Sequence, residues 1–419
     1  MFMRRMGALL SLLFLGCGTP ETRPTNPVVP APRASISASA AASADTAPAE
    51  TPSVQTNRIP SRGLLADVAI LRKTYESLHP GLYRYNTPAQ MAEHFNALEA
   101  EFSRDRTLTE AYLAFSVFLA KIKCGHSYAN FYNQSKSVVA ALFDHQDRVP
   151  FHFRWINKRM IVTQDFSGHA LIDPGVEILA INGTKADVIF DRLMPIARAD
   201  GSNDGKRASQ LEVRGFNTWE TFDIFFPLFF PPQSTTYSLD IRLRDGTTSN
   251  VQVTALTQQE RENERRGQKE AIQWKEITWK VEYPERGLAV LRVPTFALYN
   301  SRWDWKKFLD TTFAEFPGRG IKNLVIDIRG NEGGIDTAGY FASKLSAEPI
   351  EIDPYERRVR YQKIPDGIGL YLDTWDPSFK DWGSDAYDFK DGFFKLKGEN
   401  AQKLANAPKK TKPFRGKTF

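Results

Sequence analysis

Two short, largely apolar runs in the last third of the chain constrain its fold more than any other feature. They cover residues 288–293 and 323–328, and a helical pattern over residues 303–316 separates them. Runs of this kind are typical of strands that are buried on both faces of a parallel sheet. A strand, helix, strand order within one sheet forms a right-handed crossover. With another helix over residues 337–345, the pattern predicts an α/β core whose ligand site lies at the carboxyl ends of the strands.

A glycine-rich loop of sequence RGNEGG, residues 329–334, follows the second run. The adjacent Gly333 and Gly334 permit backbone conformations that are closed to other residues. We expect their N–H groups to be bare at a helix N-terminus, where the helix dipole favours negative charge. Such a loop could hold a phosphate or the oxyanion of an acyl transfer, or it could be a purely structural turn. It lacks the spacing of a phosphate loop or of a dinucleotide site.

The N-terminus has the features of an export signal. Arg4 and Arg5 precede a short apolar run over residues 7–16, and Cys17 follows this run directly. The run is too short to span a membrane, which needs about 20 residues. Residues 1–17 resemble a bacterial lipoprotein signal peptide, and an ordinary cleavable signal is the alternative. We expect Cys17 to be lipidated and to anchor an exported protein to a membrane of the cell envelope, on its periplasmic or extracellular face.

Residues 18–58 are rich in Thr, Pro, Ala and Ser and contain few aromatic residues. Such a segment buries too little apolar surface to fold, so it is predicted to be a disordered tether. Apolar positions at helical spacing then predict an N-terminal helical domain over residues 59–140. Its helices are expected at residues 64–78, 91–102 and 107–123. His79, which precedes Pro80, is interpreted as the stop of the first helix.

Residues 146–257 change to short alternating strands with turn signals at Asn157-Lys158, Asn182-Gly183 and Asp245-Gly246. This pattern predicts a small, partly open β module with one helix at residues 186–196. The aromatic segment 219–230 is interpreted as a buried seam between domains, with a substrate groove as the alternative. Residues 258–279 are highly charged and are expected to form a solvated helix or linker, which leads into a core over residues 280–419.

The net charge of +6 is mild for 419 residues, and no basic stripe is interleaved with aromatic residues. Nucleic-acid binding is therefore not expected. The histidines show no metal-ligand spacing, and no cofactor is predicted. Cys124 lies two positions before His126, but this adjacency is weak evidence for a nucleophile, and we interpret Cys124 as a buried structural thiol.

Residues 324–334 resemble the D-[LIF]-R-x-N-x-G-G signature of the tail-specific, or C-terminal-processing, serine proteases. Four other segments resemble the same family in the same order. They are residues 79–83, the Gly-His-Ser element 125–127, a PDZ-like segment 175–183, and residues 287–296. The resemblance implies a ClpP/crotonase-like core preceded by a helical domain and a PDZ-like β module. It also implies a serine-type peptidase that cleaves polypeptides through an acyl-enzyme.

The Gly-His element is similar to the tricorn-core branch, whose histidine is the general base to a serine. The resemblance therefore implies that His126 is the base, and that Gly333 and Gly334 supply or position an oxyanion-hole N–H. The branch has a serine before this histidine, whereas this chain has Gly125.

The family's serine follows a strand that begins after a Gly-Lys turn, and Gly416-Lys417 looks like the start of that strand. The serines after the glycine-rich loop do not fit this pattern. They are Ser343, Ser346, Ser378 and Ser384. We therefore expect a core that is cut off before its nucleophile. Without a nucleophile, only about 10³–10⁴-fold acceleration over water would remain. Enzymes typically reach at least about 10⁶-fold, so the chain as given is expected to be inactive or nearly so.

Two other functions stay open. One is a non-catalytic binding or scaffold lipoprotein on the same fold, which would use the aromatic segment 219–230. The other is a crotonase-type acyl-CoA enzyme, which the signal peptide and the PDZ-like module disfavour.

Overall fold

The computed structural model describes residues 58–215, 218–267, 279–299, 301–346, 356–374, 376–397 and 413–419. The predicted signal peptide with Cys17, and the tether up to residue 57, lie outside the described residues. Within these ranges, no helix is both long enough and apolar enough to cross a membrane.

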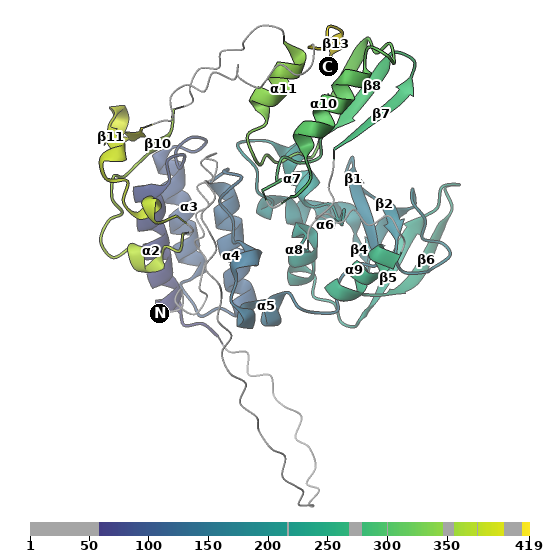
Figure 1. Cartoon of the computed structure of the whole chain (residues 1–419). Helices are drawn as coiled ribbons and strands as arrows, with labels where there is room; N and C mark the ends of the chain where they lie inside the picture. The colour runs from purple at the N-terminus through teal and green to yellow at the C-terminus, as the bar shows by residue number, and fades with distance from the viewer. Residues whose placement is uncertain are drawn as a thin grey trace, which may run out of the picture.

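Three helices form the beginning of the described chain, as the apolar spacing predicted (Figure 1). They are α2 (Ser61–Leu78), α3 (Pro88–Glu101) and α4 (Leu108–Lys121), followed by η1 (Phe131–Asn133) and α5 (Lys136–Leu142). Thr87 and Thr107 begin α3 and α4 with capping boxes, in which Gln90 and Glu110 return the hydrogen bond.

The β module is an antiparallel sheet in the order β1-β2-β3-β5-β6, with β4 paired to β3. Its strands are β1 (Phe151–Ile156), β2 (Arg159–Asp165), β3 (Glu177–Ile181), β4 (Thr184–Lys185), β5 (Thr236–Arg242) and β6 (Thr248–Thr254). Asn157 and Lys158 both have positive φ, as a two-residue hairpin turn requires. Four helical segments connect β4 to β5. They are α6 (Ala186–Leu193), η2 (Met194–Ile196), α7 (Asp204–Gln210) and α8 (Thr221–Phe229).

Helix α8 joins the helical part to the β module. Phe225 stacks on Tyr112 of α4 at 5.8 Å, and Phe222 meets the edge of Phe153 of β1 at 4.8 Å. Phe226 is also buried, at 3% exposure. The burial predicted for the aromatic segment is confirmed for α8, and the substrate-groove alternative is wrong there, because these rings belong to one core cluster.

The charged segment after the β module begins as helix α9 (Gln258–Gly267). The expectation of a solvated segment is wrong for Arg261, which is only 6% exposed. Its guanidinium donates to both carboxylate oxygens of the buried Asp223 on α8. Residues 268–278 of this segment lie outside the described residues.

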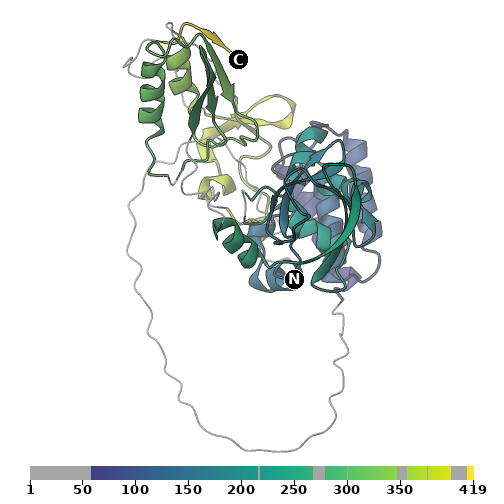
Figure 2. The same cartoon turned by 90° about the vertical axis from the view of Figure 1, so that its right-hand side faces the viewer.

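The C-terminal region is a mixed α/β unit, with a four-stranded sheet in the order β13-β9-β8-β7. The strands are β7 (Lys280–Glu285), β8 (Leu288–Arg292), β9 (Asn323–Asp327) and β13 (Lys417–Thr418). β8 and β9 are parallel, as predicted, and β13 adds in parallel to β9, whereas β7 is an antiparallel edge strand that the sequence pattern did not indicate. Helices α10 (Trp305–Glu315) and α11 (Ala338–Leu345) pack on the sheet side that buries Ala289, Leu291 and Leu324 (Figure 2).

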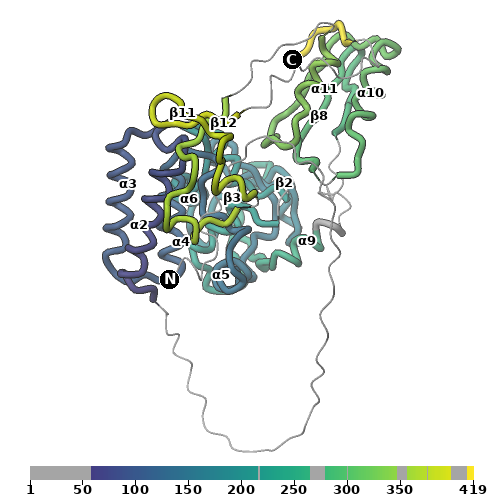
Figure 3. Tube along the Cα trace, turned by 60° about the vertical axis from the view of Figure 1, so that its left-hand side comes forward, coloured from purple at the N-terminus to yellow at the C-terminus, as the bar shows by residue number. Residues whose placement is uncertain are grey.

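Between α11 and β13, a small antiparallel sheet returns to the start of the described chain. Its strands are β10 (Arg358–Val359), β11 (Ala386–Asp388) and β12 (Phe394–Leu396), with 3₁₀ turns η4 (Gly369–Tyr371), η5 (Pro377–Lys380), η6 (Gly383–Asp385) and η7 (Lys390–Gly392). Buried apolar side chains of this sheet pack on Leu78 at the end of α2. Lys73 of α2 also donates to the Asp366 carbonyl at 3.3 Å. The segment that carries β11 and β12 therefore lies beside α2 (Figure 3).

Candidate active site

The glycine-rich loop starts from a fixed carboxylate at the end of β9. Arg329 donates to Asp327 from Nε and from a terminal nitrogen, each at 2.8 Å, and Arg292 adds a bond at 3.0 Å. The hydrogen bond from Arg329 is the main cause that lowers the pKa of Asp327 to about 2. Asp327 is therefore an ionised carboxylate near neutral pH. It fixes the start of the loop by hydrogen bonds and does not act as a proton donor.

Gly333 does not have the bare amide that the sequence led us to expect. Its N–H donates to Asn331 Oδ1 at 2.9 Å, and Asn331 Nδ2 in turn donates to the Val293 carbonyl at 2.9 Å. Asn side chains commonly bond to the backbone N–H two residues further on, and Asn331 does so here. Gly333 thus shapes the loop, and its amide is already paired.

Gly334 has the free amide. It forms a parallel bridge with Phe296, in which Phe296 N–H donates to the Gly333 carbonyl at 3.1 Å and Ile335 N–H donates to the Phe296 carbonyl at 2.8 Å. In such a bridge, the N–H of the middle residue points away from the partner strand. Within the described part of the chain, the Gly334 N–H has no acceptor.

No other residue fits at position 334. A Cβ built there would lie 1.9 Å from the carbonyl carbon and oxygen of Phe296, and the φ of Gly334 is +146°. The close approach of the Phe296 backbone therefore requires glycine at position 334. The same approach leaves the unpaired Gly334 N–H pointing out of the loop.

The glycine amides do not lie at a helix N-terminus, contrary to the expectation from the sequence. Helix α11 begins at Ala338, and its Ala338 N–H donates to Asp336 Oδ1 at 3.0 Å. Because Asp336 places its own carboxylate there, this helix end is already supplied with negative charge.

His126 lies on a tight turn after α4. Ser127 N–H donates to the Cys124 carbonyl at 3.0 Å and closes the turn, and the His126 side chain is exposed. Gly125 N–H donates to Asp200 Oδ1 at 3.1 Å. A Cβ at Gly125 would lie 3.3 Å from Asp200 Oδ2, so the acidic side chain occupies the place beside His126 where a larger residue would project.

His79 lies beneath this turn and does more than end α2. It is 5% exposed and stacks on Tyr75. Its Nδ1 accepts the Gly81 N–H at 3.1 Å, so in the neutral ring the proton is on Nε2. Nε2 lies 3.2 Å from Ser127 Oγ and donates to it. His79 thus anchors one end of the His126 turn.

Cys124, at the other end of the turn, is half-buried and not the fully buried thiol that was expected. Burial raises the pKa of the Cys124 thiol, but hydrogen bonds with His79, with the backbone of His126 and with Ser127 outweigh burial and leave the pKa below its usual value. Hydrogen-bond donors that stabilise a thiolate also increase its availability as a nucleophile.

Helix α7 and the residues before it connect the His126 turn to the glycine-rich loop. Gly201 N–H donates to the Lys123 carbonyl at 2.9 Å, beside the turn. From α7 itself, Lys206 Nζ and Gln210 Nε2 both donate to Glu332 Oε1 of the loop. In the described structure, no hydrogen bond joins His126 itself to residues 328–334, so their connection runs through α7.

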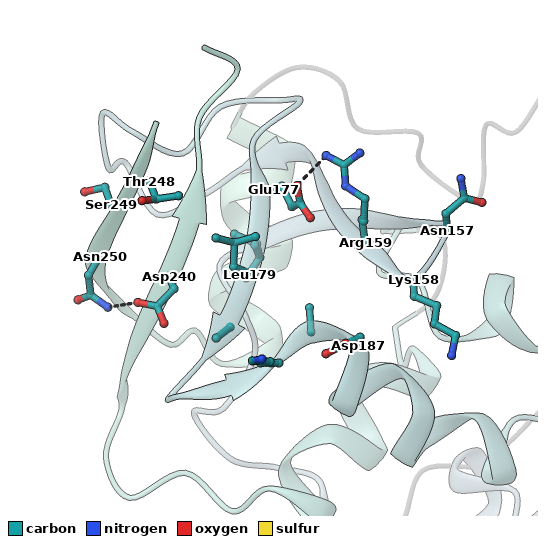
Figure 4. A pocket seen from close by; sticks show the side chains of 14 residues that line it. Asn157, Lys158, Arg159, Glu177, Leu179, Asp187, Asp240, Thr248, Ser249 and Asn250 are labelled. Carbon is teal, nitrogen blue, oxygen red and sulfur yellow. Dashed lines mark hydrogen bonds and ion pairs between the residues drawn. The ribbon is translucent and has the colours of Figure 1, made fainter. Parts of the chain in front are cut away.

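The serines of the C-terminal region show no catalytic arrangement. Ser343 Oγ donates to the Tyr340 carbonyl of its own helix at 2.7 Å, and Ser378 N–H bonds Asp376 in a local turn. A groove of about 870 Å³ lies on the β module instead, where Leu179 is surrounded by charged side chains that include Arg159 and Asp240 (Figure 4). Neither His126 nor the glycine-rich loop lines this groove.

Comparison with known proteins bears on the C-terminal region. Residues 287–413 match the model of Peptidase family S41. No curated protein matches the sequence. The structure of mature CPAF complexed with lactacystin is similar over 71% of this chain and 61% of that chain, with 12% identity and a TM-score of 0.46. The tricorn protease is similar over 71% of this chain and 25% of that chain, with 12% identity and a TM-score of 0.22.

This chain spans about three fifths of the length of the CPAF chains that it matches. The overlays are loose, so the family model is the comparison that counts here. It covers β8, α10, the glycine-rich loop and α11, which are the elements that build the Gly334 amide. The match supports membership of this α/β region in peptidase family S41.

Proposed function

We propose that this protein is a serine-type peptidase of the tail-specific kind, and that it is related to the tricorn-core branch. His126 is its general base, and the Gly334 N–H is an oxyanion donor. The observation that carries the proposal is the unpaired Gly334 amide, which the Phe296 bridge forces out of a loop in the S41-matching region. One such donor typically contributes about 2.7–4 kcal/mol to transition-state stabilisation.

His126 suits the role of a base because it is exposed on a turn that three contacts hold in place. Asp200 binds the turn at Gly125, Gly201 binds it at Lys123, and His79 binds it at Ser127. These contacts fix the backbone of the turn, so they define the position from which the His126 side chain extends toward a substrate. The substrate proposed is a polypeptide, which the PDZ-like β module would bind next to this site.

This chain is proposed to lack the nucleophilic serine. Of the serines that follow the loop, Ser343 donates within its own helix and Ser378 lies in a local turn. Binding and the oxyanion donor alone would then give the chain an acceleration of acyl transfer of roughly 10³–10⁴-fold over water. Cys17 is proposed as the lipid anchor to a cell-envelope membrane. Partition of the expressed protein into detergent, with loss in Cys17→Ala, would test the anchor.

The test of the active site is hydrolysis of a peptidyl p-nitrophenyl ester by the purified chain. We expect acceleration of roughly 10³-fold over buffer from binding and the oxyanion donor. His126, acting as general base to the attacking water, should add a further factor of roughly 10², and this factor should be lost in His126→Ala. His145→Ala is the matched control, because His145 is also exposed and its Nε2 bonds the Ala141 carbonyl near the end of α5, away from the loop. Equal rates in the His126 variant, in the control and in buffer would refute the site.

The absence of the nucleophile is tested separately with a fluorophosphonate probe. No serine of this chain is expected to be labelled. Labelling of any serine, located by mass spectrometry, would overturn this part of the proposal and would still support a serine-type peptidase.

A further inference from the structure

We infer that Glu332 is a positioning residue, which fixes the Gly334 amide relative to the His126 turn through residues 200–210, here called the spacer. This inference rests on the proposed function and adds to it a residue that holds the two halves of the site together. Glu332 immediately precedes the two glycines of the loop. Its side chain leaves the loop and accepts hydrogen bonds from Lys206 Nζ and from Gln210 Nε2, the latter at 3.3 Å.

The two donors are four residues apart on α7, so they project from the same face of the helix. Both reach the same carboxylate oxygen, Oε1 of Glu332. The guanidinium of Arg214, just after the helix, lies 3.5 Å from the position that a Cβ of Gly330 would take, so it fills the space beside the loop. The hydrogen bonds that hold the loop from the outside are those of Glu332.

The spacer is stiffened by its own side chains. Asn203 Oδ1 accepts the Lys206 N–H at 2.9 Å and caps α7. Arg207 donates to the Gly201 carbonyl at 2.6 Å and to Asp204 at 2.8 Å. These bonds run along the spacer from Gly201 to α7, so a displacement at one end is transmitted to the other.

The other end of the spacer holds the base. Asp200 Oδ1 accepts the Gly125 N–H, and Gly201 N–H donates to the Lys123 carbonyl. The ring of Tyr85 lies 3.0 Å from the position of a Cβ on Gly201, whose φ is +58°, so only glycine fits there without strain. Continuous bonded contacts therefore lead from the residue before His126 to the residue before Gly333.

The inner side of the loop does not supply this connection. Asn331 binds the Val293 carbonyl and Gly333 pairs with Phe296, and both partners belong to the same α/β region. Loss of the Glu332 side chain would leave these bonds in place. The loop would stay folded, but its position relative to the His126 turn would no longer be fixed from α7.

The contacts of Glu332 are exposed, with 56% of its side chain and 32% of the Lys206 side chain accessible. Exposed pairs of this kind add little to stability. Misplacement of reacting groups by about 1 Å, in contrast, costs about 10²-fold in rate. A positioning role therefore predicts a large loss of rate with little loss of stability, whereas a purely structural surface pair predicts little change in either the rate or the stability.

The experiment compares Glu332→Ala with the exchanged pair Lys206→Glu, Glu332→Lys in the full chain. Hydrogen exchange of peptides that cover residues 328–335 is expected to accelerate about tenfold in Glu332→Ala, because the outer contacts of the loop are lost. Exchange in β8 should stay unchanged. The exchanged pair should restore slow exchange, because it rebuilds the ion pair with reversed charges.

Glu315→Ala is the matched control, since Glu315 forms an exposed pair with Arg319 on α10, away from the loop. Ester hydrolysis should fall about 10²-fold in Glu332→Ala through kcat rather than KM, and it should recover in the exchanged pair. Unchanged exchange of residues 328–335 in Glu332→Ala, or failure of the exchanged pair to restore it, would overturn the inference. If the wild-type chain shows no ester hydrolysis, the proposed function fails, while the exchange measurement still decides the role of Glu332.

Discussion

Substitution of the two adjacent loop glycines by alanine should have very different effects, because only one of them meets the chain on its Cβ side. Gly333 has a φ of +97°, and a Cβ there would find nothing within 4 Å. Gly333→Ala should therefore cost only the strain of a left-handed residue, about 1–2 kcal/mol of unfolding free energy. Its hydrogen bond to Asn331 remains possible.

Gly334→Ala adds a collision to the strain. The new Cβ would lie 1.9 Å from the Phe296 carbonyl and 2.2 Å from the Ala297 nitrogen, both of which are backbone atoms that no rotamer change can move. The bridge to Phe296 would have to open, with its two hydrogen bonds at 3.1 and 2.8 Å. Backbone strain, overpacking and the two lost bonds together set a lower limit of about 4 kcal/mol.

Urea-dependent hydrogen exchange of peptides from residues 288–298 measures the stability of this region alone. We expect Gly334→Ala to be less stable than Gly333→Ala by at least about 2 kcal/mol. A difference below about 0.5 kcal/mol would show that Phe296 does not approach Gly334 as described, and the argument for an aimed amide would fail with it.

Two further substitutions test buried contacts elsewhere. His79→Phe keeps a ring on Tyr75 but removes the hydrogen bond to Cys124, so the pKa of the thiol should rise. Alkylation of Cys124 by iodoacetamide should then shift to higher pH, and an unchanged pH profile of alkylation would contradict the contact. Arg261→Met leaves Asp223 buried without its partner and should destabilise the protein by about 3–5 kcal/mol in thermal unfolding. The double variant with Asp223→Leu should recover much of this loss, and a double variant as unstable as the single one would refute the explanation.

The strands and helices of the C-terminal region were predictable because each carries its own local pattern. The apolar runs that became β8 and β9 pair in parallel, and the helix between them is present. The loop was recognised from its glycines, but the pattern could not tell which amide is free. Asn331 offered a signal, since this residue type often binds the backbone two positions later.

Contacts between distant segments were not predictable. Nothing in the local sequence indicates that Gly125 meets Asp200, or that Lys206 meets Glu332, because periodicity reports only the neighbours along one element. The same limit explains Arg261, whose charged surroundings in the sequence suggested a solvated helix. The Arg261 side chain is buried because it pairs with Asp223, which lies on another helix.

The return of the chain to α2 sets an order for its folding. Lys73 and Asp366 are 293 positions apart, and Leu78 packs under residues as late as Leu396. Contacts of such long sequence separation slow folding, because the entropy of closing a long loop is lost before the contact forms. During synthesis, α2 must emerge first and hold an uncovered apolar end until nearly the whole described chain has left the ribosome. An early helix that waits for a late partner is a natural binding site for a chaperone.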